Sequence, residues 1–159
     1  MKLAEALLIR SDLQKKLFQL KARIANNVKV QDGDSPNEDP NALIIEANQV
    51  ITELATLIEK IHRTNALSQT SEGESLLSLL NKREELEMRH KLLSDAIDMA
   101  SNEAARYSPR EIKWKVMVSV SALQKQADDL SMKLRKLKLG IQANNWQIDL
   151  VQEALLRSS

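Results

Sequence analysis

The stretch of residues 120–156, VSALQKQADDLSMKLRKLKLGIQANNWQIDLVQEALL, decides the fold of this chain. Its apolar positions step alternately by three and four residues, which is the period of a helix that packs along a narrow seam. We therefore expect one long helix over 120–156. Its seam positions are Leu123, Ala127, Leu130, Leu134, Leu137, Ile141, Asn144, Ile148, Val151 and Leu155.

Three further segments keep the same rhythm, and they predict helices at about 2–26, 41–65 and 75–106. Long helices with one seam each pack nearly antiparallel with a left-handed supercoil. The sequence therefore predicts a mainly α fold, a long antiparallel four-helix bundle that resembles a coiled coil and forms a single helical domain over 1–159. The three seams are Leu3, Ala6, Arg10, Leu13, Leu17, Leu20 and Ile24; Ile44, Ala47, Ile51, Leu54, Ile58, Ile61 and Asn65; and Leu76, Leu79, Arg83, Leu86, His90, Leu93, Ile97, Ala100 and Ala104.

The composition favours helices and excludes several classes of protein. Of 159 residues only 3% are aromatic, with three Gly and three Pro, whereas sandwiches and barrels need aromatic strands and many turns. There is no Cys, which excludes disulfides, thiolate catalysis, Cys-ligated zinc and iron–sulfur clusters. The net charge of +1 creates no field that would attract polyanions. We expect no cofactor.

Two short segments depart from the helical period. Polar and apolar side chains alternate over 111–118 and again in Val28-Lys29-Val30, and a period of two is typical of a half-buried strand. We expect a short β-ribbon or extended segment near 28–31 and 111–118. An isolated ribbon is only marginally stable, so it must rest on the helices.

The N-terminal stretch does not have the pattern of a secretory signal. Its uncharged run, Ala6–Ile9, lies between Glu5 and Arg10, whereas a signal needs about 7–15 unbroken apolar residues. No stretch approaches the roughly 18 apolar residues of a membrane span. The sequence predicts a cytoplasmic protein with no integral membrane insertion.

The predicted helices differ in length. At 1.5 Å per residue, the helix over 120–156 would be about 55 Å long and the first helix about 39 Å. A monomeric bundle would leave part of the longer apolar stripe uncovered. We therefore expect a homo-oligomer with an isologous helical interface.

Five polar residues occupy seam positions that packing alone would give to Leu or Ala. One interpretation is a buried polar network or a ligand site. Another is that they fix the register of the helices, a role well attested for polar seam residues, and the arginines near helix ends can extend their charges to water. We favour register or solvent contact. The five are Arg10, Asn65, Arg83, His90 and Asn144.

Two Glu-x-x-His pairs, Glu59-x-x-His62 and Glu87-x-x-His90, lie on two predicted helices. Di-iron bundle proteins use such pairs, because the spacing points both ligands at one metal. Across an antiparallel hairpin, however, the two pairs would lie about 16 Å out of level, whereas paired metals lie about 3.5–4 Å apart. We therefore predict no metal site and keep a metal-dependent enzyme with carboxylate and His ligands as the third hypothesis.

One non-helical segment mixes cations with two aromatic residues. This mixture is suited to single-stranded nucleic acid or to a membrane surface. Alternatively, Trp114 and Tyr107 cap the end of the bundle core while the cations stay in water. The near-zero net charge favours this alternative, so we do not expect nucleic acid as a partner. The candidate binding residues are Arg106, Tyr107, Arg110, Lys113, Trp114 and Lys115.

Five short motifs follow one another over nearly the whole chain. They are Asn27-x-x-Val30-Gln31-x-Gly33, Glu38-Asp39-Pro40, Arg63-Thr64-Asn65, Arg106-Tyr107-Ser108-x-x-Glu111-Ile112-Lys113-Trp114 and Asn145-Trp146. With these motifs the chain resembles the septicolysin-like family of small bacterial proteins. The resemblance implies a helical, oligomeric bacterial protein, and the family name implies a cytolysin. It offers no catalytic residues to carry over.

These observations give three hypotheses of function. The first is a non-enzymatic protein of unknown molecular role that acts through homo-oligomeric assembly or surface interaction. Its functional surface would lie in the Arg106–Lys115 region and the Val28–Asp39 loop, since irregular segments on a rigid scaffold commonly carry function. The second is a membrane-active, septicolysin-like cytolysin, and the third is the metal-dependent enzyme. Partners other than the chain itself are not identified by the sequence.

Overall fold

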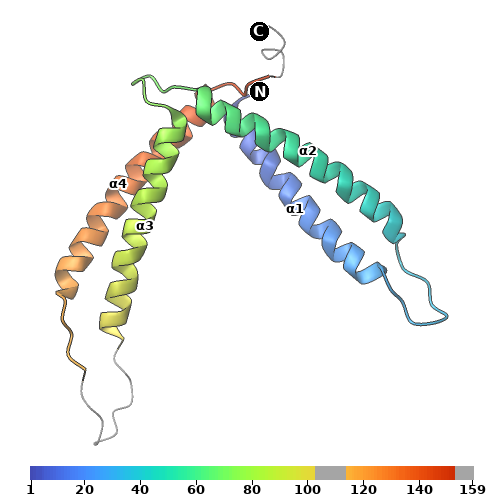
Figure 1. The fold of residues 1–159 in the computed structure, drawn as a ribbon, viewed down its shortest axis with the longest axis horizontal. Helices are drawn as coiled ribbons and strands as arrows, with labels where there is room; N and C mark the ends of the chain where they lie inside the picture. The colour runs from blue at the N-terminus through green and yellow to red at the C-terminus, as the bar shows by residue number, and fades with distance from the viewer. Residues whose placement is uncertain (103–113, 153–159) are drawn as a thin grey trace, which may run out of the picture. The chain divides into compact units, whose positions relative to one another are not determined.

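A computed structural model of the chain describes residues 1–102 and 114–152. The described residues form four helices, so the predicted mainly α fold is confirmed (Figure 1). The helices belong to two compact units, one comprising Met1–Ser75 with the segment from Asn144 onward and the other Leu76–Ala143. The helices are α1 (Leu3–Asn27), α2 (Pro40–Leu67), α3 (Leu76–Ser101) and α4 (Val120–Gln147).

In the first unit, α1 and α2 lie side by side as a hairpin (Figure 1). Every predicted seam position of α1 is buried or half-buried, because α1 has a single apolar stripe and buries it against α2. Burial of each Leu or Ile side chain contributes roughly 1.5–3 kcal/mol, so this stripe holds the hairpin together. The core of the contact comprises Leu20, Leu43, Ala47 and Val50, with Leu13, Leu17 and Ile24 packed against it.

The seam of α2 is rotated from the predicted one. Leu43 and Val50 are buried, whereas the predicted seam residues Ile44 and Ile51 are 41% and 45% exposed. On the surface of α2, apolar residues recur every seven positions and so form three adjacent columns along the helix. A single partner helix covers only two of these columns. A column that includes Ile44 and Ile51 therefore stays open on the hairpin.

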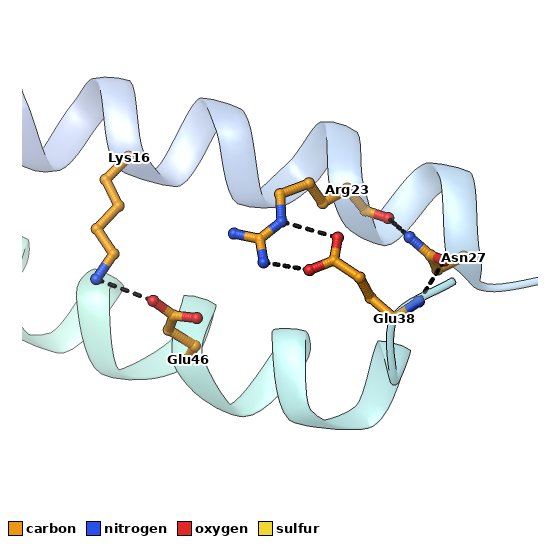
Figure 2. A network of polar contacts seen from close by, with 5 residues as sticks. All are labelled: Lys16, Arg23, Asn27, Glu38 and Glu46. Atoms are coloured by element: carbon orange, nitrogen blue, oxygen red, sulfur yellow. Dashed lines mark hydrogen bonds and ion pairs between the residues drawn. The ribbon is translucent and has the colours of Figure 1, made fainter. Parts of the chain in front are cut away.

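A polar network closes the tip of the α1–α2 hairpin (Figure 2). The Asn27 side chain donates to the Arg23 carbonyl at 2.8 Å and accepts from the Glu38 N–H at 3.0 Å, while Arg23 forms a bidentate ion pair with Glu38. The Arg23 hydrogen bond holds the pKa of Glu38 below its ordinary value, and Glu38 raises the pKa of Arg23. Lys16 and Glu46 add a second ion pair at 2.9 Å. The network ties the end of α1 to the residue that precedes the α2 cap.

The start of α2 follows helix-capping chemistry. The Asp39 carboxylate accepts a hydrogen bond from the Asn41 N–H at 2.9 Å, and Pro40 occupies the first helical position. Proline is favoured there because its missing N–H would have no partner inside the helix. The sequence signal Glu38-Asp39-Pro40 thus has a structural role at this hairpin tip.

The predicted β-ribbon is not found in the described part of its two segments, 28–31 and 114–118. Val28 instead continues the last turn of α1, donating to the Ile24 carbonyl at 3.0 Å, and the Gln31 carbonyl accepts from Asp34 in a turn. The local helix and turn bonds therefore replace strand pairing, which is marginal for two short pieces. Residues 111–113 of the predicted ribbon lie outside the described residues.

Helix α4 ends at Gln147, so the prediction of a helix to residue 156 is wrong for 148–152. The Leu3 N–H donates to the Ile148 carbonyl at 2.9 Å, and the Leu150 N–H donates to the Met1 carbonyl at 2.9 Å. The three-four spacing of apolar residues continues here, but backbone partners from the start of the chain replace the helical ones. Residues 153–156 and 103–106, the predicted ends of two helices, lie outside the described residues.

The four helices are consequently similar in length. Helix α1 has 25 residues and α4 has 28, or about 38 Å and about 42 Å at 1.5 Å per residue. The length difference from which the sequence predicted a homo-oligomer is therefore absent from the described helices. The surfaces available for association are instead the exposed faces of the helices.

In the second unit, α3 and α4 lie side by side as another hairpin (Figure 1). The predicted seam positions of α3 up to Ala100 and of α4 up to Asn144 are buried or half-buried. The buried members are few, since a two-helix contact covers only one side of each helix. They are Leu76, Ala127, Leu134 and Ile141.

Thr64 anchors the segment after α4 to α2. Its side chain is fully buried, donates to the Lys60 carbonyl at 2.7 Å and accepts from the Val151 N–H at 3.0 Å. Thr64→Val keeps the shape but leaves the Val151 N–H without its acceptor, so we expect a loss of about 1–3 kcal/mol in the free energy of unfolding. Urea denaturation followed by circular dichroism measures it.

The matched control is Thr52→Val. Thr52 makes the same local bond, to the Asn48 carbonyl at 3.1 Å, on the exposed side of the same helix. A surface change of this kind stays within about 0.5 kcal/mol. Equal losses for the two variants would contradict the anchoring role of Thr64.

Candidate functional site

The polar contacts of the α3–α4 hairpin centre on His90. Its Nε2 lies 2.9 Å from the Ser131 Oγ of α4, and its Nδ1 lies 3.5 Å from the Ser94 Oγ one turn along α3. His90 is a predicted seam residue, whereas Ser131 was not identified from the sequence because it lies one position beside the seam. The contact links the two helices at one level.

A second interhelical contact lies one turn away from His90. The Lys138 ammonium lies 2.8 Å from the Glu87 carboxylate and, through this hydrogen bond, holds the pKa of Glu87 below its ordinary value. The charge of Arg83 acts in the same direction. Glu87, half of one Glu-x-x-His pair, is thus engaged by cations of its own hairpin.

A shallow groove runs along these contacts, with a volume of about 460 Å³. Two cations and two leucines give it a mixed character. Its lining residues are Glu87, His90, Ser131, Leu134, Arg135, Lys138, Leu139 and Gln142.

The Ser131–His90 pair has part of the geometry of an activated nucleophile. A nucleophilic serine needs a base that a third group orients, and donors for the developing oxyanion. The group nearest to His90 Nδ1 is the neutral Ser94 hydroxyl, and Ser131 lies inside a helix, where backbone N–H groups are bonded to the preceding turn. The pair is therefore best interpreted as a contact that fixes helix register.

The other predicted seam residues lie at half-buried positions. The Nε atoms of Arg10 and Arg83 are buried and have no hydrogen-bond partner among the described residues. Asn65 and Asn144 are half-buried, and the Asn144 carbonyl accepts from the Ile148 N–H at 2.9 Å. Their role in register stays a prediction.

The rotation of α2 changes which polar residue is buried near its end. Thr64 lies in the core, and the predicted Asn65 beside it is only half-buried. Sequence reasoning missed Thr64 because its column is one residue away from the expected seam. The three parallel apolar columns of α2 are the sequence signal that more than one seam is possible on this helix.

The basic, aromatic segment falls largely outside the described residues, which include neither Arg106, Tyr107, Arg110 nor Lys113. Trp114 is 82% exposed, Met117 is 81% exposed, and Lys115 is exposed between them. The expectation that Trp114 caps the bundle core is therefore wrong.

Neither Glu-x-x-His pair forms a metal site within residues 1–102 and 114–152. In that part of the chain, no group of three or more His, Asp or Glu residues is placed to hold an ion. Glu59 is paired with Arg63 one turn along α2, and Glu87 is paired with Lys138. Each carboxylate thus has a cationic side chain as its partner.

Apolar side chains outside the seams are the other marked feature of both hairpins. On α4, Met132, Leu139 and Trp146 follow one another at seven-residue spacing and are more than half exposed. On α2, Ile44 and Ile51 have the same spacing. Seven residues return to nearly the same side of a helix, so each set forms a stripe.

The first unit also has an apolar groove. It has a volume of about 580 Å³ and lies beside the start of α1 and the middle of α2. Its lining residues are Met1, Ile9, Gln49, Thr52, Glu53, Thr56, Leu57, Lys60 and Leu150.

These features define a mainly α protein whose hairpins each bury one seam and expose further apolar stripes. None of the described helices has the length and apolar character needed to cross a membrane. The chain belongs to a family of unknown function, DUF6847, whose profile matches residues 10–150.

Among solved structures, the chain is similar to a functionally unknown conserved protein from Corynebacterium diphtheriae. The two are 34% identical with a TM-score of 0.84, over 95% of this chain and 99% of the other. No curated protein matches the chain.

The register role of His90 is tested by His90→Ala. Loss of the bond to Ser131 should lower the free energy of unfolding by about 0.5–1.5 kcal/mol, measured by urea denaturation. His62→Ala is the control, because His62 is exposed on α2. An effect of His90→Ala no larger than that of His62→Ala would show that the contact does not hold the helices.

Proposed function

We propose that the protein is a non-enzymatic, cytoplasmic helical protein. It acts by associating through the exposed faces of its helices, and its first partner is a second copy of the same chain. The observation that carries this proposal is the presence of apolar stripes at seven-residue spacing outside the seams. They include Met132 and Leu139 on α4 and Ile44 and Ile51 on α2.

The energetics of such stripes favour association. Burying an exposed Leu, Ile or Met side chain contributes roughly 1.5–3 kcal/mol. Contiguous apolar surface on a folded protein commonly marks an interaction site, whereas isolated apolar residues do not. Apolar residues that repeat along one side of a helix form a stripe, and the partner that best covers such a stripe is another helix.

The comparisons are compatible with this proposal at a coarse level. The family is one of unknown function, and the similar protein of known structure from Corynebacterium diphtheriae is also functionally unknown. Both findings are compatible with a molecular role that is not yet known, and self-association is tested by the experiment below.

Self-association is tested by sedimentation velocity over a range of protein concentrations. We expect a species of at least twice the mass of the chain, whose share grows with concentration. A single species with the mass of one chain at every concentration, with helical content intact, would contradict the proposal.

A second function, membrane activity as implied by the septicolysin-like resemblance, is favoured by one observation. Trp114 and Met117 are almost fully exposed and flank the cation Lys115. Large apolar side chains beside cations are typical of segments that lie on anionic membrane surfaces. A cytolysin would have to bind a lipid bilayer and make it leak.

For this second function, Trp146→Phe leaves Trp114 as the single tryptophan. Vesicles of anionic lipid should shift its fluorescence to the blue and release entrapped dye. The double variant Trp114→Ser, Met117→Ser has no Trp114 signal, so it is compared by dye release alone, and it should release no measurable dye. Intact vesicles and an unchanged Trp114 spectrum with folded protein would exclude membrane activity.

A further inference from the structure

The outer side of α4 carries a line of residues at seven-residue spacing, in which Lys125 precedes the apolar Met132, Leu139 and Trp146. Met132 and Leu139 are 64% and 62% exposed, and Lys125 continues their line toward the start of the helix. This line faces away from the column of buried seam residues Ala127, Leu134 and Ile141. The hairpin partner α3 therefore does not cover it.

Charges flank Met132 symmetrically. Asp128 and Asp129 precede it by four and three residues, and Arg135 and Lys136 follow it by three and four. Residues at these separations are neighbours of Met132 on the helix surface. Met132 thus lies between an acidic pair on its N-terminal side and a basic pair on its C-terminal side.

These charges are not used within the hairpin. Among the described residues, no ion-pair partner is found for Asp129, Arg135 or Lys136, and Asp128 accepts only from the Gln124 amide at 2.9 Å. By contrast, neighbouring charges of the same hairpin, such as Lys138 and Lys91, are paired. Asp129, Arg135 and Lys136 are therefore available to pair with charges of a second molecule.

We propose that the outer side of α4 is the interface of an antiparallel dimer, in which α4 of one copy packs on α4 of a second copy about a twofold axis at Met132. Such an arrangement places Met132 against Met132, Leu139 against the aliphatic stem of Lys125, Asp128 against Arg135 and Asp129 against Lys136. Both halves of the contact are then identical, as an isologous interface requires.

The charge pattern selects both the partner and the orientation. Each chain has one α4, so the complementary surface comes from a second copy. A parallel pairing would place acid against acid and base against base, which is unfavourable. The exposed ion pairs contribute mainly orientation, and the small apolar contact gives a weak, concentration-dependent dimer. This interface rests on the proposed self-association and names its surface.

Charge reversal tests the interface. Arg135→Glu with Lys136→Glu should weaken self-association about tenfold or more, because four acidic residues then meet four. Asp128→Lys with Asp129→Lys should do the same with four basic residues. Combining all four substitutions restores complementarity and should restore the dimer, and mixing the two double variants should yield a heterodimer. Circular dichroism verifies that each variant keeps its helices.

Cysteine cross-linking tests the position of the axis, because the chain has no Cys of its own. Met132→Cys should form a disulfide-linked dimer under mild oxidation. Leu139→Cys alone should form far less, whereas Leu139→Cys with Lys125→Cys should cross-link.

The results of these experiments distinguish a wrong interface from a wrong proposed function. Charge-reversed variants that associate as the parent does, or a fourfold variant that fails to recover, would overturn this interface while the protein still self-associates. A parent chain that stays monomeric at all concentrations would overturn both proposals.

Discussion

The rest of the structure depends on one constraint: a helix in a two-helix hairpin can bury only one stripe of its surface. Helices α1, α3 and α4 each place their seam against a single partner, and the remaining sides stay in water. Where the sequence supplies a second apolar stripe, the hairpin has nothing to cover it. The open isoleucines of α2 and the outer line of α4 follow directly from this constraint.

Polar contacts lie at a tip of the first hairpin and between the helices of the second, beside rather than within the apolar cores. Asn27, Arg23 and Glu38 close one tip, and His90 with Ser131 links α3 to α4 at one level. Thr64 and the backbone around Ile148 hold the segment after α4 against α2 and the start of the chain. The fully buried member of this set is Thr64, whose hydroxyl has both its donor and its acceptor capacity met by these contacts.

The sequence predicted the helix number and most seams because a single apolar stripe has only one way to be buried. It failed on α2, where three apolar columns fit the same spacing and only packing decides which two face α1. It failed on the end of α4 because the spacing carries no information about the backbone partners Met1 and Leu3. It missed Ser131 and Thr64 because polar residues beside a seam look like surface residues until the partner is known.

The central claim is that apolar helix sides left open by the hairpins meet a second copy of the chain, and that Met132 lies at the centre of the contact. Only five methionines are present, so methyl NMR on a mixture of labelled and unlabelled chains can test it. The account predicts magnetisation transfer between copies at the Met132 methyl. Transfer confined to other methionines, or none in a sample that sediments as a dimer, would contradict it.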